Sequence, residues 1–360
     1  MKNYVALILA GGGGSRLWPM SRAGKPKQML PLVDQHSMFK VSVDRLAPLF
    51  TPDRIFVSTA ASYVDDLQQE CPTIPYENFI AEPSARNNAA AVALAITVIE
   101  KRYPDAIIAM LASDHHIGKT EHFRDVLATA GTIANDGKIV TLGISPAFPS
   151  TGFGYIQQGA MIGNQDGLDY YVAQRFTEKP DVVRASQFVA SGKYSWNSGM
   201  FIWKASKAMA EFERQQNELY QLFKYLQSAV DTPDYQQTLE SMWEKTPKIS
   251  IDYAIMEDAE DMVVIPVDIA WSDVGTWSSL YDVLDRDKFG NCVKDMSQDR
   301  IVLDAKDTLL FSDKLTVAIG VDNIIVVETD DVLMVCHKDR AQDVKQIVTY
   351  LRENGMEDYL

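Results

Sequence analysis

An unbroken apolar run that leads directly into consecutive glycines stands near the start of this sequence. Val5 to Ala10 contain no polar residue, and Gly11 to Gly14 follow at once. A strand without polar alternation is expected to be buried on both faces, as in a parallel sheet covered by helices. This feature therefore restricts the chain to an α/β fold with a glycine-rich loop after its first strand.

The glycine loop and the residues after it predict a polyphosphate site. Without Cβ atoms, the backbone N–H groups of such a loop can approach an anion closely. Four basic residues follow, Arg16, Arg22, Lys25 and Lys27, and the first acidic residue is Asp34, in a chain of net charge −15. A tight turn without a ligand is the alternative, and the basic neighbours favour phosphate binding.

Two familiar glycine loops are excluded by spacing. No register of Gly11 to Gly14 produces G-x-G-x-x-G, the dinucleotide fingerprint. A Walker A loop would need a glycine where Pro19 stands, and Pro26 follows Lys25 where that motif requires serine or threonine.

Composition and targeting signals limit the class of protein. The 360 residues have room for one large and one smaller domain. The acidic balance argues against a general nucleic-acid binder. No apolar run approaches the roughly 20 residues needed to span a bilayer, and no signal peptide precedes the first strand. Cys71, Cys292 and Cys336 form no CxxC pair and are expected to be reduced. We therefore expect a cytoplasmic protein without membrane contact.

Apolar runs and helical patterns alternate over the first 145 residues, which predicts a mixed, mostly parallel sheet with helices on both faces. Further on, 205–228 and 234–244 read as helices. Polar turn residues at 285–291 mark a boundary, and short apolar strands then recur at even intervals before a closing helix at 341–353. We predict a domain at 1–287 and a β-rich domain or β-solenoid at 288–360.

Two carboxylates are placed to hold a cation. Asp114 ends a strongly apolar strand, where open α/β sheets bind ligands, and Asp273 also follows an apolar strand. Such a pair leaves coordination positions for phosphate oxygens and water, as Mg²⁺ prefers. Asp114 could instead only cap the next helix. The adjacent His115 and His116 are poorly spaced for zinc, and no cysteine accompanies them.

Other polar segments fit a sugar. Asn197 lies between two tryptophans, so amide hydrogen bonds would stand beside aromatic faces, although core packing has a similar composition. Glu178 and Lys179 precede Pro180 and could equally form a solvated strand end.

The motifs together resemble the sugar-nucleotide pyrophosphorylases. The version with Leu17, Trp18 and Pro19 resembles the mannose-1-phosphate guanylyltransferases, also called GDP-mannose pyrophosphorylases. The matching segments occur in the family's order: the opening loop, Glu82 to Asn87, Ser113 to His115, Phe176 to Pro180, Trp196 to Gly199, Ser250 to Tyr253 and Trp271 to Trp277.

The resemblance implies a Rossmann-like nucleotidyltransferase domain, a β-helix-like C-terminal domain and a homodimer. It also implies an enzyme of GDP-mannose biosynthesis that joins mannose 1-phosphate and GTP, with Mg²⁺, into GDP-mannose and pyrophosphate. The sugar phosphate is already an anionic nucleophile, so positioning and cationic stabilisation would carry the reaction. This agrees with the absence of a Ser–His or Cys–His arrangement among the motifs.

The same resemblance assigns roles to individual residues. Arg16, Lys27, Asp114 and Asp273 would be catalytic, with Asp114 and Asp273 as the metal ligands. The nucleotide would be bound by Ala10, Gly11, Gly12, Gly13, Gly14, Ser15, Arg16, Lys27, Glu82, Arg86, Asn87 and Asp114. The sugar phosphate would be bound by Gly154, Glu178, Lys179, Asn197 and Asp252.

Two other functions remain open at this stage. The chain could use a different hexose 1-phosphate or base, or it could be a nucleotide-binding regulatory subunit without turnover. A subunit of the second kind would be expected to lack metal carboxylates or the phosphate lysine, and Asp114, Asp273 and Lys27 are all present.

Overall fold

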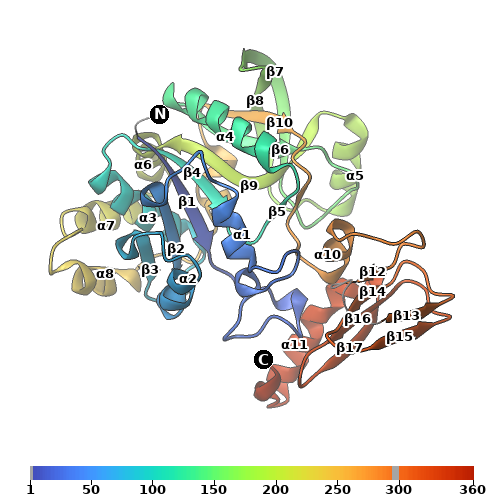
Figure 1. The fold of residues 1–360 in the computed structure, drawn as a ribbon. Coiled ribbons are helices and arrows are strands. Elements are labelled where there is room, and N and C mark those ends of the chain that lie inside the picture. The colour runs from blue at the N-terminus through green and yellow to red at the C-terminus, as the bar shows by residue number, and fades with distance from the viewer. Residues whose placement is uncertain (1–2, 294–299) are drawn as a thin grey trace. The chain divides into compact units, whose positions relative to one another are not determined.

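The computed structural model describes residues 3–293 and 300–360 (Figure 1). These residues form two compact units, each considered by itself. Unit 1 contains residues 3–11, Val43–Ala112 and Ile117–Trp271; unit 2 contains Gly12–Ser42, Ser113–His116 and the described residues from Ser272 to Leu360. The domain boundary expected at residues 287 and 288 stays a prediction.

A nine-stranded mixed sheet forms the centre of unit 1, in the order β3-β2-β1-β4-β9-β6-β10-β8-β7. Its strands are β1 (Tyr4–Ala10), β2 (Ile55–Ala60), β3 (Phe79–Glu82), β4 (Ile107–Ala112), β6 (Ile139–Ile144), β7 (Tyr155–Gln165), β8 (Leu168–Thr177), β9 (Tyr194–Lys204) and β10 (Met262–Val267). β1 pairs in parallel with β2 and β4, whereas β9 runs antiparallel between β4 and β6. The predicted mixed, mostly parallel sheet is confirmed.

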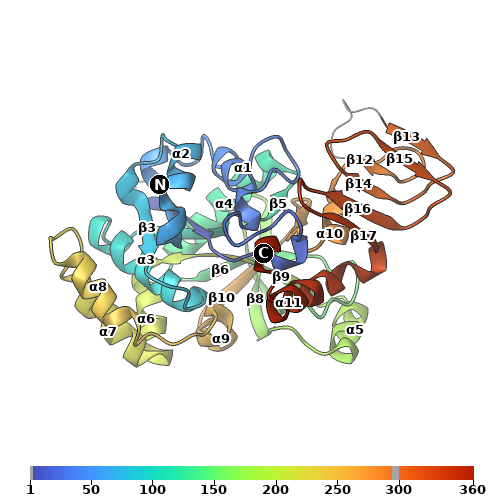
Figure 2. The same cartoon turned by 90° about the horizontal axis from the view of Figure 1, so that it is seen from below.

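Both faces of β1 are buried, which explains its unbroken apolar sequence. Val5 and Leu7 belong to a buried cluster that includes α3 (Asn88–Arg102). Tyr4 points the other way, because side chains alternate along a strand, and its hydroxyl donates to the Leu127 carbonyl of α4 (Thr120–Asn135) at 2.7 Å. The two helices therefore cover opposite faces of the sheet, as Figure 2 shows.

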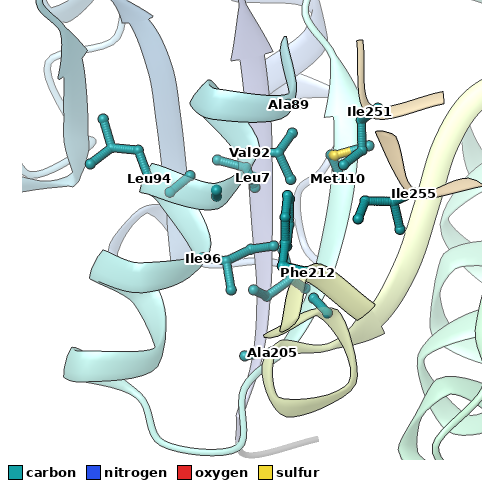
Figure 3. Close-up of a cluster of buried hydrophobic side chains, with 14 of the residues drawn as sticks. Leu7, Ala89, Val92, Leu94, Ile96, Met110, Ala205, Phe212, Ile251 and Ile255 are labelled. Atoms are coloured by element: carbon teal, nitrogen blue, oxygen red, sulfur yellow. The ribbon is translucent and has the colours of Figure 1, made fainter. Parts of the chain in front are cut away.

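The cluster on the α3 side is one hydrophobic core of unit 1 (Figure 3). Its members come from the sheet, from α3 and from α6 (Ala205–Gln215), α7 (Asn217–Gln227), α8 (Tyr235–Trp243) and α9 (Ile251–Ala254). The single helix expected over 205–228 is wrong: Gln216 leaves helical geometry at φ −135°, and its side chain donates to the Ala254 carbonyl at 3.2 Å.

The remaining short elements are α1 (Met38–Asp44), α2 (Val64–Glu70), α5 (Val182–Ser191), β5 (His116–Ile117) and β11 (Trp271–Ser272). Within the described residues, no helix combines the length and apolar character needed to cross a bilayer.

Unit 2 contains a parallel β-coil. The strands β12 (Cys292–Val293), β14 (Leu309–Phe311), β16 (Ile324–Glu328) and β17 (Leu333–His337) form one sheet, and β13 (Arg300–Leu303) and β15 (Thr316–Ile319) form a second. Consecutive strands from β12 to β16 alternate between the two sheets; β12 pairs in parallel with β14, β13 with β15 and β14 with β16, and β17 then runs antiparallel to β16. This confirms the predicted β-helix-like domain.

The core of unit 2 joins the coil to the opening loop. Leu309 and Phe311 pack in a cluster with Trp277 of α10 (Trp277–Val283) and with α11 (Val344–Glu353), and Trp18 belongs to the same cluster. Leu310, on the other face of β14, packs inside the coil against Ala318. The segment after the glycine loop is thus part of the same core as the coil.

Phe212 offers a test of the unit 1 core. Its side chain is 1% exposed, so Phe212→Ala should lower the free energy of unfolding by about 3–5 kcal/mol, through lost burial and a cavity. Urea denaturation followed by circular dichroism measures this change. As a control, Tyr225→Ala on α7, where the side chain is 67% exposed, should change stability by less than about 0.5 kcal/mol. Equal effects would contradict the assignment of the core.

Candidate active site

The glycine loop presents open backbone. A Cβ added at Gly11, Gly12 or Gly13 would meet no atom within 4 Å, and all three residues are exposed. Gly12 has φ 107°, a conformation that side chains disfavour. An anion can therefore approach these N–H groups without displacing side chains. Just before the loop, the hydroxyl of Thr59 donates to the Ala10 carbonyl at 2.8 Å and fixes the end of β1.

Gly14 has a second reason to be glycine. It has φ 60°, and a Cβ there would overlap the Cβ of Lys27. The Ser21 hydroxyl donates to the Gly14 carbonyl at 2.8 Å, which holds this close approach. Ser15 and Arg16 follow on a one-turn 3₁₀ helix, Ser15–Leu17, where Arg16 is exposed.

Lys27 is a buried cation among oxygen acceptors. It begins the 3₁₀ turn Lys27–Met29 and is 5% exposed. Its Nζ lies 2.8 Å from Oδ2 of Asp114 and also donates to the main-chain carbonyl of Asp273. Burial raises the pKa of the Asp114 carboxyl, but Lys27 and His115 outweigh burial, and the net pKa is lowered. Lys27, Asp114 and Asp273 are thus brought together within unit 2.

The backbone around Asp273 is strained. Val274 is β-branched and buried yet has φ 44°, a conformation rare for such residues. Oδ1 of Asp273 accepts from the Gly275 N–H at 3.2 Å, and a Cβ on Gly275 would lie 2.5 Å from Oδ2. Strain of this kind persists where surrounding contacts fix it, and it concentrates at functional sites. The sequence does not signal it, because valine is an improbable residue for this conformation.

The donor set around Lys27 suits Mg²⁺. Asp114 and Asp273 carry carboxylates, the ligand type that hard cations prefer, and the Lys27 ammonium binds the Asp114 carboxylate and the Asp273 main-chain carbonyl. In the part of the chain that the structure describes, no group of three or more His, Cys, Asp or Glu side chains could hold a metal. Mg²⁺ usually takes one or two protein carboxylates plus phosphates and water, so two carboxylates fit it better than zinc.

The predicted base-binding residues lie on the loop between β3 and α3. Glu82 ends β3; burial raises the pKa of its carboxyl, and the Ser58 hydroxyl donates to it at 3.2 Å. Arg86 forms an ion pair with Glu244, a partner that no sequence motif indicates. Asn87 caps α3 by accepting from the Asn88 N–H at 2.9 Å, with φ 65°.

The predicted sugar-binding residues lie close together in unit 1: Asn197 is hydrogen-bonded to Asp252 and Gly154, and the Glu178 carboxylate lies beside Gly154. Asn197 donates through Nδ2 to Oδ1 of Asp252 at 3.1 Å, and its N–H donates to the Gly154 carbonyl at 2.8 Å. Glu178, with a side chain 5% exposed, is paired with Lys179. A Cβ on Gly154 would lie 2.5 Å from Oε2 of Glu178, so the space between them requires glycine.

Two carboxylates share the charge of Lys179 in this group. Burial and the neighbouring Glu178 raise the pKa of Asp252 to about 6, against the opposing effect of Lys179. Burial lowers the pKa of Lys179, but Glu178 outweighs it and the net pKa is raised. Lys179 has φ 44°, and the N–H of Glu178 donates to Glu257 at 3.2 Å. Glu257 has no motif that would reveal it.

One contact joins the two predicted groups of unit 1. The Asn88 side chain accepts from the Ile251 N–H at 2.8 Å, so the first residue of α3 is tied to α9, which carries Asp252. No sequence motif distinguishes Asn88 as a structural residue. Each group, in unit 1 and in unit 2, has side chains of the type that its predicted ligand requires.

Comparison with known proteins identifies the class. The family model for nucleotidyl transferase matches residues 5–288, and the model for a MannoseP isomerase/GMP-like beta-helix domain matches residues 298–351. The chain therefore belongs to the nucleotidyl transferase family.

Its relatives show which branch of the nucleotidyl transferase family the chain resembles. Xanthan biosynthesis protein XanB of Xanthomonas campestris is 38% identical over 99% of this chain and 74% of its own length. A mannose-1-phosphate guanylyltransferase of Klebsiella pneumoniae is 38% identical over 98% of this chain and 75% of its own length. A crystal structure from Thermus thermophilus, described as a mannose-1-phosphate geranyltransferase, superposes with a TM-score of 0.88 at 31% identity, over 97% of this chain and 99% of that one. The predicted family is confirmed.

The raised pKa of Asp252 predicts a pH-dependent stability. Its pKa of about 6 exceeds the ordinary 3.8, so between these values the folded state keeps a proton that the unfolded chain releases. Stability should fall as pH rises through this window. The side chain in Asp252→Asn cannot ionise. The free energy of unfolding of this variant should therefore rise relative to that of the wild type from pH 4 to pH 7, by at most about 3 kcal/mol.

Urea denaturation at pH 4, 5, 6 and 7 measures this difference. Asp66→Asn, at an exposed position on α2, serves as the control and should give a curve parallel to the wild type. A pH-independent offset for Asp252→Asn would contradict the raised pKa.

Proposed function

We propose that this chain transfers GMP from GTP to mannose 1-phosphate, forming GDP-mannose and pyrophosphate. The observation that carries the proposal is the group of Lys27, Asp114 and Asp273 beside the exposed glycine loop. It combines a cation, a metal-suited carboxylate pair and an anion-binding backbone. The specific substrates are supported by the similar proteins named mannose-1-phosphate guanylyltransferase.

The reaction is a phosphoryl substitution. A phosphate oxygen of mannose 1-phosphate attacks the α-phosphorus of GTP; the new P–O bond forms while the bond to the β-phosphate oxygen breaks, and pyrophosphate leaves with that electron pair. The attacking oxygen is already ionised near neutral pH, so no base must remove a proton. Catalysis then depends on bringing two anions together and on stabilising the charge of the leaving group.

The triphosphate would be held by the opening loop. The N–H groups from Ala10 through Gly14 and Ser15 would cradle it, and Arg16, exposed on its short helix, would extend to its oxygens. Lys27 would stabilise the phosphates nearest the reacting phosphorus. Glu82, Arg86 and Asn87 would bind the guanine side of the nucleotide.

Asp114 and Asp273 would hold Mg²⁺. When bound there, the ion supplies positive charge that offsets the repulsion between the two phosphates. Before it binds, Lys27 neutralises Asp114, and the two carboxylates are kept in place by Lys27 and by the strained turn at Val274. The site would therefore be formed in advance of the metal.

The hexose would bind in the group around Asn197. Glu178 and Asp252 can accept hydrogen bonds from sugar hydroxyls, and Asn197 can both donate and accept. Lys179, more than half exposed, would contact the phosphate of the sugar. Gly154 leaves space that a side chain would fill.

We also propose a homodimer and a cytoplasmic location. Apolar side chains are exposed along β13 and β15, where Ile301 pairs with Val317 and Leu303 with Ile319. An exposed apolar patch of this kind is typical of a protein interface. GTP as substrate, and three cysteines that form no disulfide, suit a reducing compartment.

A substrate panel tests the function. The protein is incubated with Mg²⁺, each of the four nucleoside triphosphates and several hexose 1-phosphates, and pyrophosphate release is measured. Release should be fastest with GTP and mannose 1-phosphate. Preference for another pair would support the alternative, a different hexose-1-phosphate nucleotidyltransferase, and no release with any pair would refute an enzyme of this class.

The metal assignment predicts the effect of two substitutions. Asp114→Ala and Asp273→Ala should each lower kcat roughly 100-fold or more, because each removes one of the two proposed protein ligands of the cation. Asp268→Ala is the control, since this carboxylate is 79% exposed and pairs with Lys119; its kcat should match the wild type. A near-normal rate for either site variant at ordinary Mg²⁺ would show that the assigned ligand is wrong.

A further inference from the structure

All three guanidinium nitrogens of Arg22 donate to protein oxygens. Its Nε donates to the Pro19 carbonyl at 2.7 Å and its Nη2 to Oδ1 of Asp331 at 2.8 Å, while Nη1 donates to the Tyr359 carbonyl. The side chain is 19% exposed. Its place among the basic residues of the opening segment predicts a phosphate contact, yet each of its three nitrogens already has an acceptor. Arg22 therefore differs from the exposed Arg16.

The last two residues of the chain bind the same segment. The Tyr359 carbonyl accepts from the Trp18 indole N–H at 2.8 Å as well as from Arg22, and the Leu360 carbonyl accepts from the Ala23 N–H at 2.9 Å. These contacts connect positions more than 330 residues apart in sequence. All of them lie within unit 2.

The segment held in this way connects the two proposed phosphate-binding cations. Arg16 and Lys27 lie on single 3₁₀ turns at either end of it. Between these turns the backbone forms a bridge of Arg22 with Lys25 and short turn hydrogen bonds from the Met20 and Ser21 N–H groups to the Leu17 carbonyl, with no longer helix or strand. A stretch with so little regular structure has its path set by tertiary contacts. A displacement of about 1 Å at a catalytic group can cost 100-fold in rate, so these contacts matter for chemistry.

We propose that Arg22 is a positioning residue: with Asp331 and the carbonyls of Tyr359 and Leu360 it forms a strap that fixes the segment from Arg16 to Lys27. The strap acts on kcat through Arg16 and Lys27 and makes no contact with phosphate. This inference rests on the proposed function for its catalytic consequence. The planar fork of arginine matters, because lysine cannot donate in three fixed directions.

The test compares Arg22→Lys and Asp331→Asn with Glu328→Gln. Glu328 lies on β16 close to the Asp331 turn and pairs with the exposed Lys314, so its substitution removes an ion pair of unit 2 that does not touch the strap. Hydrogen exchange of residues 16–27 is measured by mass spectrometry in the full chain. Arg22→Lys and Asp331→Asn should both raise exchange in this segment, and Glu328→Gln should not.

Kinetics separate positioning from phosphate binding. We expect kcat to fall about tenfold in Arg22→Lys and severalfold in Asp331→Asn, with KM for GTP changed less than kcat. The double variant should be no slower than Arg22→Lys alone, because both substitutions break the same contact. Glu328→Gln should retain the wild-type kcat.

Other outcomes would overturn the strap. A normal kcat for Arg22→Lys, together with a raised KM for GTP in Arg22→Ala, would make Arg22 a phosphate ligand. Unchanged exchange in Asp331→Asn would show that the contact does not restrain the segment. If the wild type itself releases no pyrophosphate, the proposed function fails, while the exchange measurement still decides whether the strap exists.

Discussion

The contact of Lys27 with Asp114 and with the carbonyl of Asp273 is the interaction on which the rest of this site depends. A buried ammonium without partners would be strongly unfavourable, so the fold must supply acceptors. Removing one partner of a buried pair typically costs about 3–5 kcal/mol; the cost here is smaller, because the Asp114 side chain is 29% exposed. The contact joins three segments of the chain that are far apart in the sequence.

Positive φ values occur at or beside three residues to which we assign the chemistry, and also at turn residues elsewhere in the described chain, such as Asp105 and Asp231. Asn87, Lys179 and Val274 all have positive φ values, at 65°, 44° and 44°. Asn87 is a proposed contact of the nucleotide and Lys179 of the sugar phosphate, and Val274 follows the proposed metal ligand Asp273. Conformations of this kind cost of order 1–3 kcal/mol each and persist only where packing fixes them. Among them, Val274 is the clearest case of strain, because a buried β-branched residue rarely has this conformation.

The β-helix-like part of the chain contributes to the site through packing. Trp18 shares a buried cluster with Trp277 and with residues of β14 and α11, and the Trp277 indole N–H donates to the Trp18 carbonyl at 2.9 Å. The opening segment has little secondary structure of its own, so it takes its geometry from these neighbours. On the proposed function, the C-terminal part would therefore help to position catalytic residues besides making the proposed dimer contact.

The sequence by itself determined the class of fold and the chemistry of the opening loop. Buried strands such as Val5 to Ala10 can be predicted from the sequence because burial on both faces excludes polar residues. The glycine loop can be predicted because consecutive glycines leave the backbone open to a ligand. Only the tertiary structure decided which partners each charged residue has. Arg22 and Lys27 are alike in sequence, five positions apart in one basic segment. Contacts with Asp331 and Tyr359 occupy the first, while Asp114 and Asp273 surround the second. Such partners come from distant parts of the chain, and no local pattern records them.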